Sequence, residues 1–328
     1  MPDKISDKVS IVVDLMGSDK GPEVLLDGVI DAAQAYPHVN LVLAGDEAII
    51  RNALGKKPNA PTFEILHAPE VITFHDQPTV AIKQKKNASM VVGLKHLKAG
   101  GAQAFVSAGS TGALLVGVFS FIKRKPGISR PALCALLPTA TGHTLLLDCG
   151  ANAEVKPNYL LEFGQLGAEY MTRTMGIKNP KVGLVNVGTE PEKGTPILQE
   201  AHGLLAASSL NFVGNIEGKG IPSGEVDVAV CDGLVGNVAL KLTEGLSKTL
   251  MGMIKEQLMA SFVSKMGALL AKGAFKKLKK RFDYREVGGA PFLGLESLVV
   301  KAHGSSDGLA IKSAIGQCVR YLQGENPK

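Results

Sequence analysis

The sequence contains no tryptophan, and only 5% of its 328 residues are aromatic. Proteins that bind single-stranded nucleic acid stack the bases on exposed aromatic rings, so this composition argues against such a partner. The net charge of +6 has the right sign for nucleic acid, but no zinc-finger, homeodomain or RNA-recognition pattern accompanies it. We therefore expect acidic partners of another kind: phosphorylated ligands, an acidic carrier protein or an anionic membrane surface.

Cysteine is also scarce. The four cysteines form no CxxC pair and have no metal-type spacing; they are Cys134, Cys149, Cys231 and Cys318. Such dispersed residues predict reduced, packed thiols, which are typical of a cytosolic protein. The first residues mix acids and bases and show no signal-peptide core, so we expect a cytoplasmic location.

Several catalytic motifs are missing. The sequence has no GxxxxGK[ST] phosphate loop, no GxGxxG fingerprint, no GxSxG elbow and no HExxH. These absences predict that no metal, nucleotide or other cofactor is needed. They favour transfer chemistry carried out by positioned polar groups.

One long stretch, residues 99–122, lacks any charged residue and is long enough to suggest a membrane span. Its centre reads Ser-Ala-Gly-Ser-Thr-Gly, which is unsuited to a continuous lipid-exposed helix. We predict instead a strand, a glycine-rich turn and a buried helix.

Apolar strands alternate with helical segments along most of the chain. The patterns predict strands at 9–15, 39–45, 62–68 and 181–188, helices at 79–98 and 158–175, and two strands that turn at Thr141 and Gly142. Strands that alternate with helices indicate an α/β fold with a mostly parallel sheet covered on both faces. We treat residues 1–328 as a single domain.

Polar residues beside glycine follow six of the predicted strands, in loops that begin at Asp14, Ser107, Asp148, Asn186, Asn215 and Asp232. Each loop alone is explained by turn formation or helix capping. Because ligands of parallel sheets bind beyond the carboxyl ends of strands, the set predicts one shared polar cleft.

Chemistry can be assigned to these loops. Backbone N–H groups in a glycine-rich turn before a helix bind phosphate without a basic side chain. The predicted phosphate ligands are therefore Ser107, Gly109, Ser110, Thr111 and Gly112. Asn186, Asn237 and Lys241 are candidates to stabilise an oxyanion, and Asp14, Asp148 and Asp232 to orient or deprotonate a nucleophile. Further candidate substrate contacts are Asn152, Lys193 and His303, the last with helix capping by Ser305 or Ser306 as the alternative.

Residues 243–282 differ from the rest and predict a protruding hairpin of two helices, 243–266 and 267–282. The second combines an apolar stripe with many lysines. This combination is typical of a helix on an anionic bilayer, and equally of a helix packed on a partner subunit. The candidate membrane contacts are Met266, Leu269, Leu270, Phe275, Lys276 and Lys277.

Eight blocks, taken in order, resemble those of the bacterial phosphate acyltransferases, which are related to phosphotransacetylases. They are VVDLMGSDKGP, VSAGSTGALL, LLDCGAN, VNVGTEPEKG, GNIEGKGI, VAVCDGLVGNVALKLTEG, GGAPFLG and KAHGSSD. The motifs depart from the usual family sequence in three places: Ser110 replaces Asn, Ser18 replaces Gly, and the pair Leu234-Val235 replaces Phe-Thr.

The resemblance implies transfer of a long fatty acyl group from acyl carrier protein to inorganic phosphate, for phosphatidic acid and phospholipid synthesis. It also implies a three-layer α/β/α sandwich like that of isocitrate and isopropylmalate dehydrogenases, a homodimer, and peripheral attachment to the inner face of the cell membrane. Direct contact with the downstream glycerol-3-phosphate acyltransferase stays open. The alternatives are a short-chain phosphotransacetylase that uses acyl-CoA, a metal- and NAD-dependent decarboxylating dehydrogenase on the same fold, and a non-enzymatic membrane scaffold.

Overall fold

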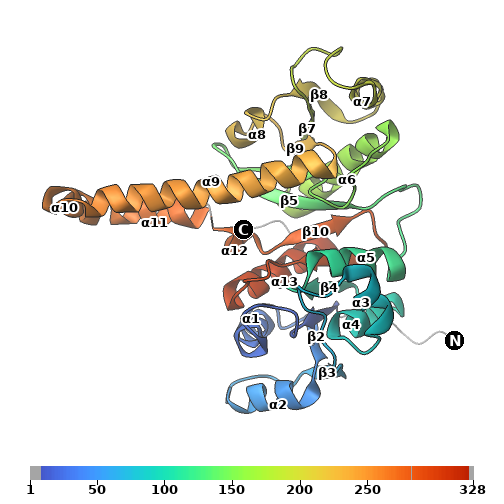
Figure 1. The fold of residues 1–328 in the computed structure, drawn as a ribbon, viewed down its shortest axis with the longest axis vertical. Helices are drawn as coiled ribbons and strands as arrows, with labels where there is room; N and C mark the ends of the chain where they lie inside the picture. Colours follow the sequence, from blue (N-terminus) through green and yellow to red (C-terminus); the bar gives the residue numbers. More distant parts are fainter. Residues whose placement is uncertain (1–8, 282, 325–328) are drawn as a thin grey trace.

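The computed structural model describes residues 9–281 and 283–324 (Figure 1). Its strands are β1 (Ser10–Asp14), β2 (Asn40–Gly45), β3 (Glu64–His67), β4 (Ala104–Ser107), β5 (Ala132–Pro138), β6 (His143–Leu147), β7 (Lys181–Val185), β8 (Asn211–Ile216), β9 (Val228–Val230), β10 (Ala290–Leu293) and β11 (Leu298–Lys301). Its helices are α1 (Pro22–Ala35), α2 (Glu47–Gly55), α3 (Pro78–Gln84), α4 (Ser89–Lys98), α5 (Thr111–Phe121), α6 (Pro157–Met175), α7 (Pro196–Ala206), α8 (Gly220–Ser223), α9 (Gly233–Met259), α10 (Phe262–Leu270), α11 (Lys272–Arg281), α12 (Tyr284–Val287) and α13 (Gly308–Gln323).

All these strands belong to one sheet, in the order β3-β2-β1-β4-β11-β10-β5-β6-β9-β7-β8. The first five strands in this order are parallel to one another, and so are the last four. Between these two blocks, the pairs β11–β10, β10–β5 and β5–β6 are all antiparallel. Three successive reversals make the two parallel blocks run in opposite directions.

Helices cover both faces of the sheet, which confirms the predicted mostly parallel, covered sheet. Alternate strand residues such as Ile11 and Val13 pack against α1, α2, α6, α7 and α13. On the other face, Val12, Phe105 and Val299 pack against α3, α4 and α5, and Leu146 packs against α8 and α9. The strand periodicity of two thus fills two cores, one on each side.

Most predicted elements lie within a few residues of their expected positions, but the predicted helix at 79–98 is wrong as one piece. It is divided into α3 and α4 by residues 85–88. Ala88 forms an isolated bridge with Glu70, and the Glu70 carboxylate accepts the Asn87 amide at 2.9 Å. These bonds hold the connecting residues in a non-helical conformation.

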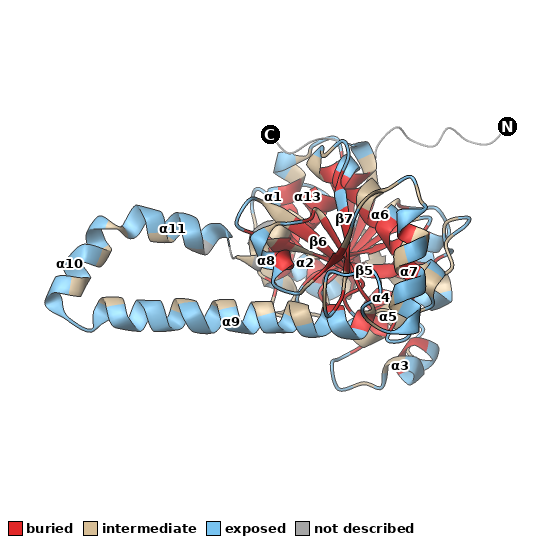
Figure 2. Ribbon diagram, turned by 90° about the horizontal axis from the view of Figure 1, so that it is seen from above, coloured by how far each residue is buried: buried red, intermediate tan, exposed pale blue. Residues whose placement is uncertain are grey.

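The hairpin also differs from its predicted bounds. Its first helix, α9, begins at Gly233 rather than at 243 and runs to Met259; Ser261 then caps α10 through a reciprocal capping box with Ser264. Residue 282, the predicted end of the hairpin, lies outside the described residues. Figure 2 shows α9, α10 and α11 projecting from the body with mostly exposed residues. Arg281 ties the returning helix to the β5–β6 turn through the carbonyls of Thr139 and Ala140.

The uncharged stretch 99–122 forms the end of the α4 region, β4, a turn and α5, as predicted. No helix of the described ranges 9–281 and 283–324 is long and apolar enough to cross a bilayer.

Candidate active site

Three neighbouring strands of the first block end in polar side chains that lie in one row. Asp14 at the end of β1 is the register partner of Ser107 on β4, which is in turn the register partner of Lys301 on β11. Register partners point to the same face of a sheet. This row therefore faces the side covered by α3, α4, α5 and α9, and all its members are buried.

Ser107 connects the row to the glycine-rich turn. Its hydroxyl donates to Asp14 Oδ2 at 2.7 Å and accepts the Gly109 amide at 3.1 Å. Burial raises the pKa of the Asp14 carboxyl, while hydrogen bonds from Ser89, Ser107 and the Met16 amide and the charge of Lys301 act to lower it. Because the Ser107 hydroxyl proton is already donated to Asp14, this side chain shapes the turn and has no proton left for a ligand.

The turn leads directly into α5. Ser110 is the helix N-cap, and its hydroxyl accepts the Ala113 amide at 3.4 Å. Thr111 is exposed and Gly112 is half-buried, so the first turn of α5 is open to solvent. Gly109 packs closely on Gly17 of the β1 loop, where an added Cβ on Gly17 would lie 2.7 Å from Gly109 Cα. The first N–H groups of α5, before Ala113, have no partner within the helix and none among the described loops, so they keep the predicted capacity for an anion.

In the second block, Asp148 follows β6 and is fully buried. Its Oδ1 accepts the amides of Leu133 and Ala151, and its Oδ2 accepts the Asn152 backbone and side-chain N–H groups at 2.6 and 2.9 Å. Burial raises the pKa of Asp148, and these four bonds oppose the rise. Asn152 spends its amide on Asp148 and the Pro131 carbonyl. Both residues hold the loop together, which is the structural alternative to a substrate role.

The start of α9 rests on this loop. Asp232 is the N-cap of α9 and accepts the amides of Leu234 and Val235 at 2.9 and 2.8 Å. Gly236 touches the loop so closely that an added Cβ would lie 1.8 Å from the Asp148 carbonyl oxygen. Asn237 is exposed beside Gly150 and makes no side-chain hydrogen bond with the described residues. The structure thus leaves the Asn237 amide available and assigns Asp232 to capping.

Lys241, two turns along α9, connects the two groups of loops. Its amine pairs with Glu244 at 2.8 Å, and its side chain is 57% exposed. Its charge acts on Cys149 beside Asp148, and also on Lys301 and His303 in and beyond β11. The six loops lie in two groups, because the antiparallel pairs β11–β10, β10–β5 and β5–β6 separate the two parallel blocks. Helix α9 spans both groups.

Two buried asparagines of the second block shape the loop after β7. Asn186 donates to the Lys193 carbonyl at 3.0 Å and accepts the Val187 amide, while Asn215 of β8 donates to the Glu190 carbonyl at 2.7 Å. This arrangement favours a structural role for Asn186 over the predicted oxyanion role. Lys193 itself is exposed on this loop.

His303 follows β11. Its Nδ1 lies 2.8 Å from the Ser305 hydroxyl, and burial lowers its pKa. The alternative, that Ser305 or Ser306 caps the next helix, is wrong. Asp307 caps α13 by accepting the Ala310 amide.

Sequence reasoning missed Lys301. Its signal was a lysine that ends the apolar run Leu298-Val-Val, where a strand inside the sheet would bury it. The amine donates to the Ala302 carbonyl.

The cysteines and metal-ligand types offer little chemistry. All four thiols are buried, and burial raises the pKa of each. They are therefore poor nucleophiles. No cluster of histidine, cysteine and acidic side chains suited to a metal occurs among the residues that the structure describes.

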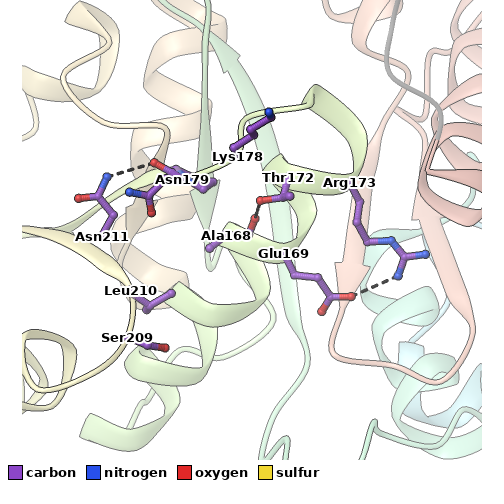
Figure 3. Close-up of a pocket in the computed structure, with 10 residues that line it drawn as sticks. Ala168, Glu169, Thr172, Arg173, Lys178, Asn179, Ser209, Leu210 and Asn211 are labelled. Carbon is purple, nitrogen blue, oxygen red and sulfur yellow. Dashed lines mark hydrogen bonds and ion pairs between the residues drawn. The ribbon is translucent and has the colours of Figure 1, made fainter.

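A surface cavity of about 290 Å³ lies elsewhere, between the end of α6 and the beginnings of β7 and β8 (Figure 3). Its walls include Arg173, Lys178 and Asn211. Since Asn186 and Asn215 lie at the opposite ends of these strands, the cavity is not part of the candidate site.

Comparison with known proteins gives a match over nearly the whole chain. Residues 9–327 match the sequence model of a family described as "Fatty acid synthesis protein". A phosphate acyltransferase of Alkaliphilus oremlandii (strain OhILAs) is 47% identical over 315 residues, which cover 96% of this chain and 94% of the relative. A phosphate acyltransferase of Clostridium novyi (strain NT) is 44% identical over 316 residues, with 96% and 95% coverage.

Solved structures agree on the fold. A phosphotransacetylase from Streptococcus pyogenes superposes with a TM-score of 0.63 at 19% identity, covering 96% of this chain and 94% of that one. A putative 4-hydroxythreonine-4-phosphate dehydrogenase from Salmonella typhimurium gives 0.52 at 12% identity, covering 96% and 100%. These likenesses confirm the predicted dehydrogenase-like α/β fold class.

Proposed function

This chain belongs to the fatty acid synthesis protein family, and from that premise we propose that it transfers a long-chain acyl group from the thioester of acyl carrier protein to inorganic phosphate. The full-length match to phosphate acyltransferases carries the proposal. In the reaction, a phosphate oxygen attacks the thioester carbonyl, the C–S bond breaks, and the proton of phosphate leaves with the carrier thiol. The products are an acyl phosphate and the free carrier, with no change of oxidation state and no cofactor.

Phosphate binds at the turn 107–112 and the start of α5. The open first turn of α5, the Thr111 hydroxyl and the Ser110 hydroxyl supply donors, while Ser107 and Asp14 hold the turn in shape. Positive potential at a helix N-terminus favours an anion there. Direct attack by phosphate is supported by the buried thiols, since none is available to form an acyl-enzyme.

The carbonyl oxygen, which becomes an oxyanion, is stabilised by Asn237 and Lys241. Both are exposed on α9, and the Asn237 amide has no partner in the described part of the chain. Donors that are fixed before the reaction contribute most to such catalysis, and removing one typically lowers kcat by roughly 100- to 1000-fold. The close packing of Gly236 on the Asp148 loop fixes the start of α9 and hence the position of Asn237.

The hairpin makes the peripheral membrane contact. Its tip, α10, exposes Leu269 and Leu270, and Phe262 and Val263 extend the predicted apolar surface. Met266 is also exposed, and so are the side chains of Lys276 and Lys277. Phe275 is half-buried. Apolar side chains in the interface and lysines near anionic headgroups together hold such a helix pair on the cytoplasmic leaflet.

A homodimer covers the apolar face of α9. Leu242, Leu246, Leu250 and Met253 recur at helical spacing, and each is about half exposed in the single chain. The positive net charge attracts the acidic carrier protein. The acyl phosphate then serves the downstream acyltransferase of phosphatidic acid synthesis.

The donor is tested by initial rates of thiol release from palmitoyl-acyl carrier protein, palmitoyl-CoA and acetyl-CoA, each with and without phosphate. We expect the palmitoyl carrier to be consumed fastest, only with phosphate, and unchanged by EDTA. Preference for acetyl-CoA would make the protein a short-chain phosphotransacetylase. Sensitivity to EDTA with NADH formation from a hydroxy acid would make it a dehydrogenase.

The hairpin is tested by sedimentation with vesicles that contain phosphatidylglycerol. Leu270→Asp should abolish binding, whereas Ile197→Asp, at an exposed apolar residue on α7, should not. Retained binding by Leu270→Asp, together with loss of the dimer, would assign the tip to the subunit interface.

A further inference from the structure

The phosphate turn 107–112 has no basic residue of its own, but a neighbouring strand brings one to its base. Lys301 is the register partner of Ser107, the first residue of the turn, and points to the same face of the sheet. It is only 7% exposed, and no carboxylate of the described residues forms an ion pair with it. A buried ammonium group without an ion-pair partner is costly, so such groups commonly have a functional reason.

The surroundings of Lys301 come from several elements. Asp14 on β1 and Asp19 in the following loop attract its charge, and Lys241 on α9 repels it. The positive charges of both lysines also act on His303, just beyond β11, and add to the lowering of its pKa by burial. Burial lowers the pKa of Lys301 to about 8, and repulsion by Lys241 adds to this effect. Two lysines whose charges act on each other favour the binding of an anion near both.

Two hydroxyls near these strand ends also lack partners. The Ser18 and Ser306 hydroxyl oxygens are buried without a hydrogen bond to any described residue. They belong to the loops after β1 and β11, which are joined by the Asp19 amide and the Gly304 carbonyl at 3.0 Å. Buried polar atoms without partners are uncommon and often mark the place of a ligand or an ordered water.

We propose that Lys301 is a phosphate-binding residue: it holds the phosphate nucleophile at the base of the turn 107–112, where the charge of Lys241 also acts. This inference rests on the proposed function for the identity of the anion. Lys301 supplies the buried cation that the turn lacks, and Asp14 limits the total positive charge, so that phosphate is held without being neutralised. A charge-assisted bond in a buried site is stronger than one in water.

The test measures phosphate binding without an acyl donor, by calorimetric titration of the wild type, Lys301→Met and Lys178→Met. Lys178 is exposed at the far ends of the second-block strands, so Lys178→Met makes the same charge change outside the site. We expect Lys301→Met to weaken phosphate binding about 10- to 100-fold and to raise the KM for phosphate more than it lowers kcat. Lys178→Met should bind phosphate as the wild type does.

A pH profile separates binding from a structural role. As the pH rises above 8, Lys301 loses its proton, so the phosphate affinity of the wild type should fall. The affinity of Lys301→Met should not show this fall, because the variant lacks the lysine. The titration of phosphate itself affects both proteins equally. Equal phosphate affinities and equal pH profiles for the two proteins would overturn the inference. If Lys301→Met does not fold, a wild-type affinity that stays flat through this range overturns it as well.

The two proposals fail in different ways. Lys301-dependent phosphate binding without acyl phosphate formation would refute the proposed reaction and leave this inference intact. Phosphate-dependent acyl transfer with normal phosphate affinity in Lys301→Met would refute only the inference.

Discussion

Replacing Gly236 with alanine should both destabilise the protein and slow the reaction. The new Cβ would lie 1.8 Å from the Asp148 carbonyl oxygen, and real contacts of this kind are essentially never below 3.0 Å. The start of α9 must therefore move away from the loop by about 1.2 Å, because both sides of the contact are backbone. Such overpacking typically costs about 1–3 kcal/mol, partly offset by about 1 kcal/mol of helix propensity gained by removing glycine.

The displacement carries Asn237 with it, since Asn237 is the next residue of the helix. A misplacement of about 1 Å in a catalytic group can lower the rate roughly 100-fold. We expect a loss of this order in kcat/KM for the acyl carrier, measured by thiol release, together with a net loss of ~0–2 kcal/mol in the free energy of unfolding, measured in urea.

Gly245, on the same helix, is the matched control. An added Cβ there meets nothing within 4 Å, so Gly245→Ala should stabilise the protein by about 0.5–1 kcal/mol and leave the activity unchanged. If Gly236→Ala resembles Gly245→Ala in both measurements, close packing does not fix the start of α9, and the account of Asn237 is wrong.

Three other changes give distinct results. Asp232→Ala should cost about 0.5–2 kcal/mol of unfolding free energy in urea, because it removes the α9 cap. Asn237→Ala should change the unfolding free energy by no more than about 0.5 kcal/mol, but should lower kcat roughly 100- to 1000-fold. The reverse pattern would exchange the roles of the two residues. Ser107→Ala should cost about 1.5–3 kcal/mol in the same assay, because the Asp14 carboxylate loses a buried donor, and an unchanged stability would contradict that bond. The pKa of Lys301 is lowered from 10.5 to about 8. Between these pH values the unfolded chain binds more protons than the folded protein, so the free energy of unfolding should rise with pH. Lys301→Met should remove this rise, and equal slopes in the two proteins would refute the lowered pKa.

The alternation of strands and helices was sufficient to predict the α/β sandwich and most of its elements. It did not reveal the reversal of the second block, because a hydrophobic period of two does not report strand direction. The strands β10 and β5, which cause the reversal, pair with each other although they are distant in the sequence. The sequence pattern therefore did not show that the six loops fall into two groups.

The start of α9 was mispredicted because Gly233 and Gly236 weaken helix propensity and read as turn residues. Tertiary packing overrides that propensity: both glycines lie against the 148–152 loop, where a larger residue would not fit. Lys301 was missed because its partners in the row, Asp14 and Ser107, come from distant strands. The glycine-rich turn before α5, by contrast, was predicted correctly from local sequence alone.

The central claim is that phosphate itself attacks the carrier thioester in this site. Its most direct measurement is trapping with hydroxylamine after incubation of the purified protein with palmitoyl-acyl carrier protein and phosphate, combined with the intact mass of the protein. The account predicts palmitoyl hydroxamate in an amount equal to the thiol released, none without phosphate, and no acyl group on the protein. Thioester loss that is independent of phosphate, or a protein mass increased by one palmitoyl group, would contradict it.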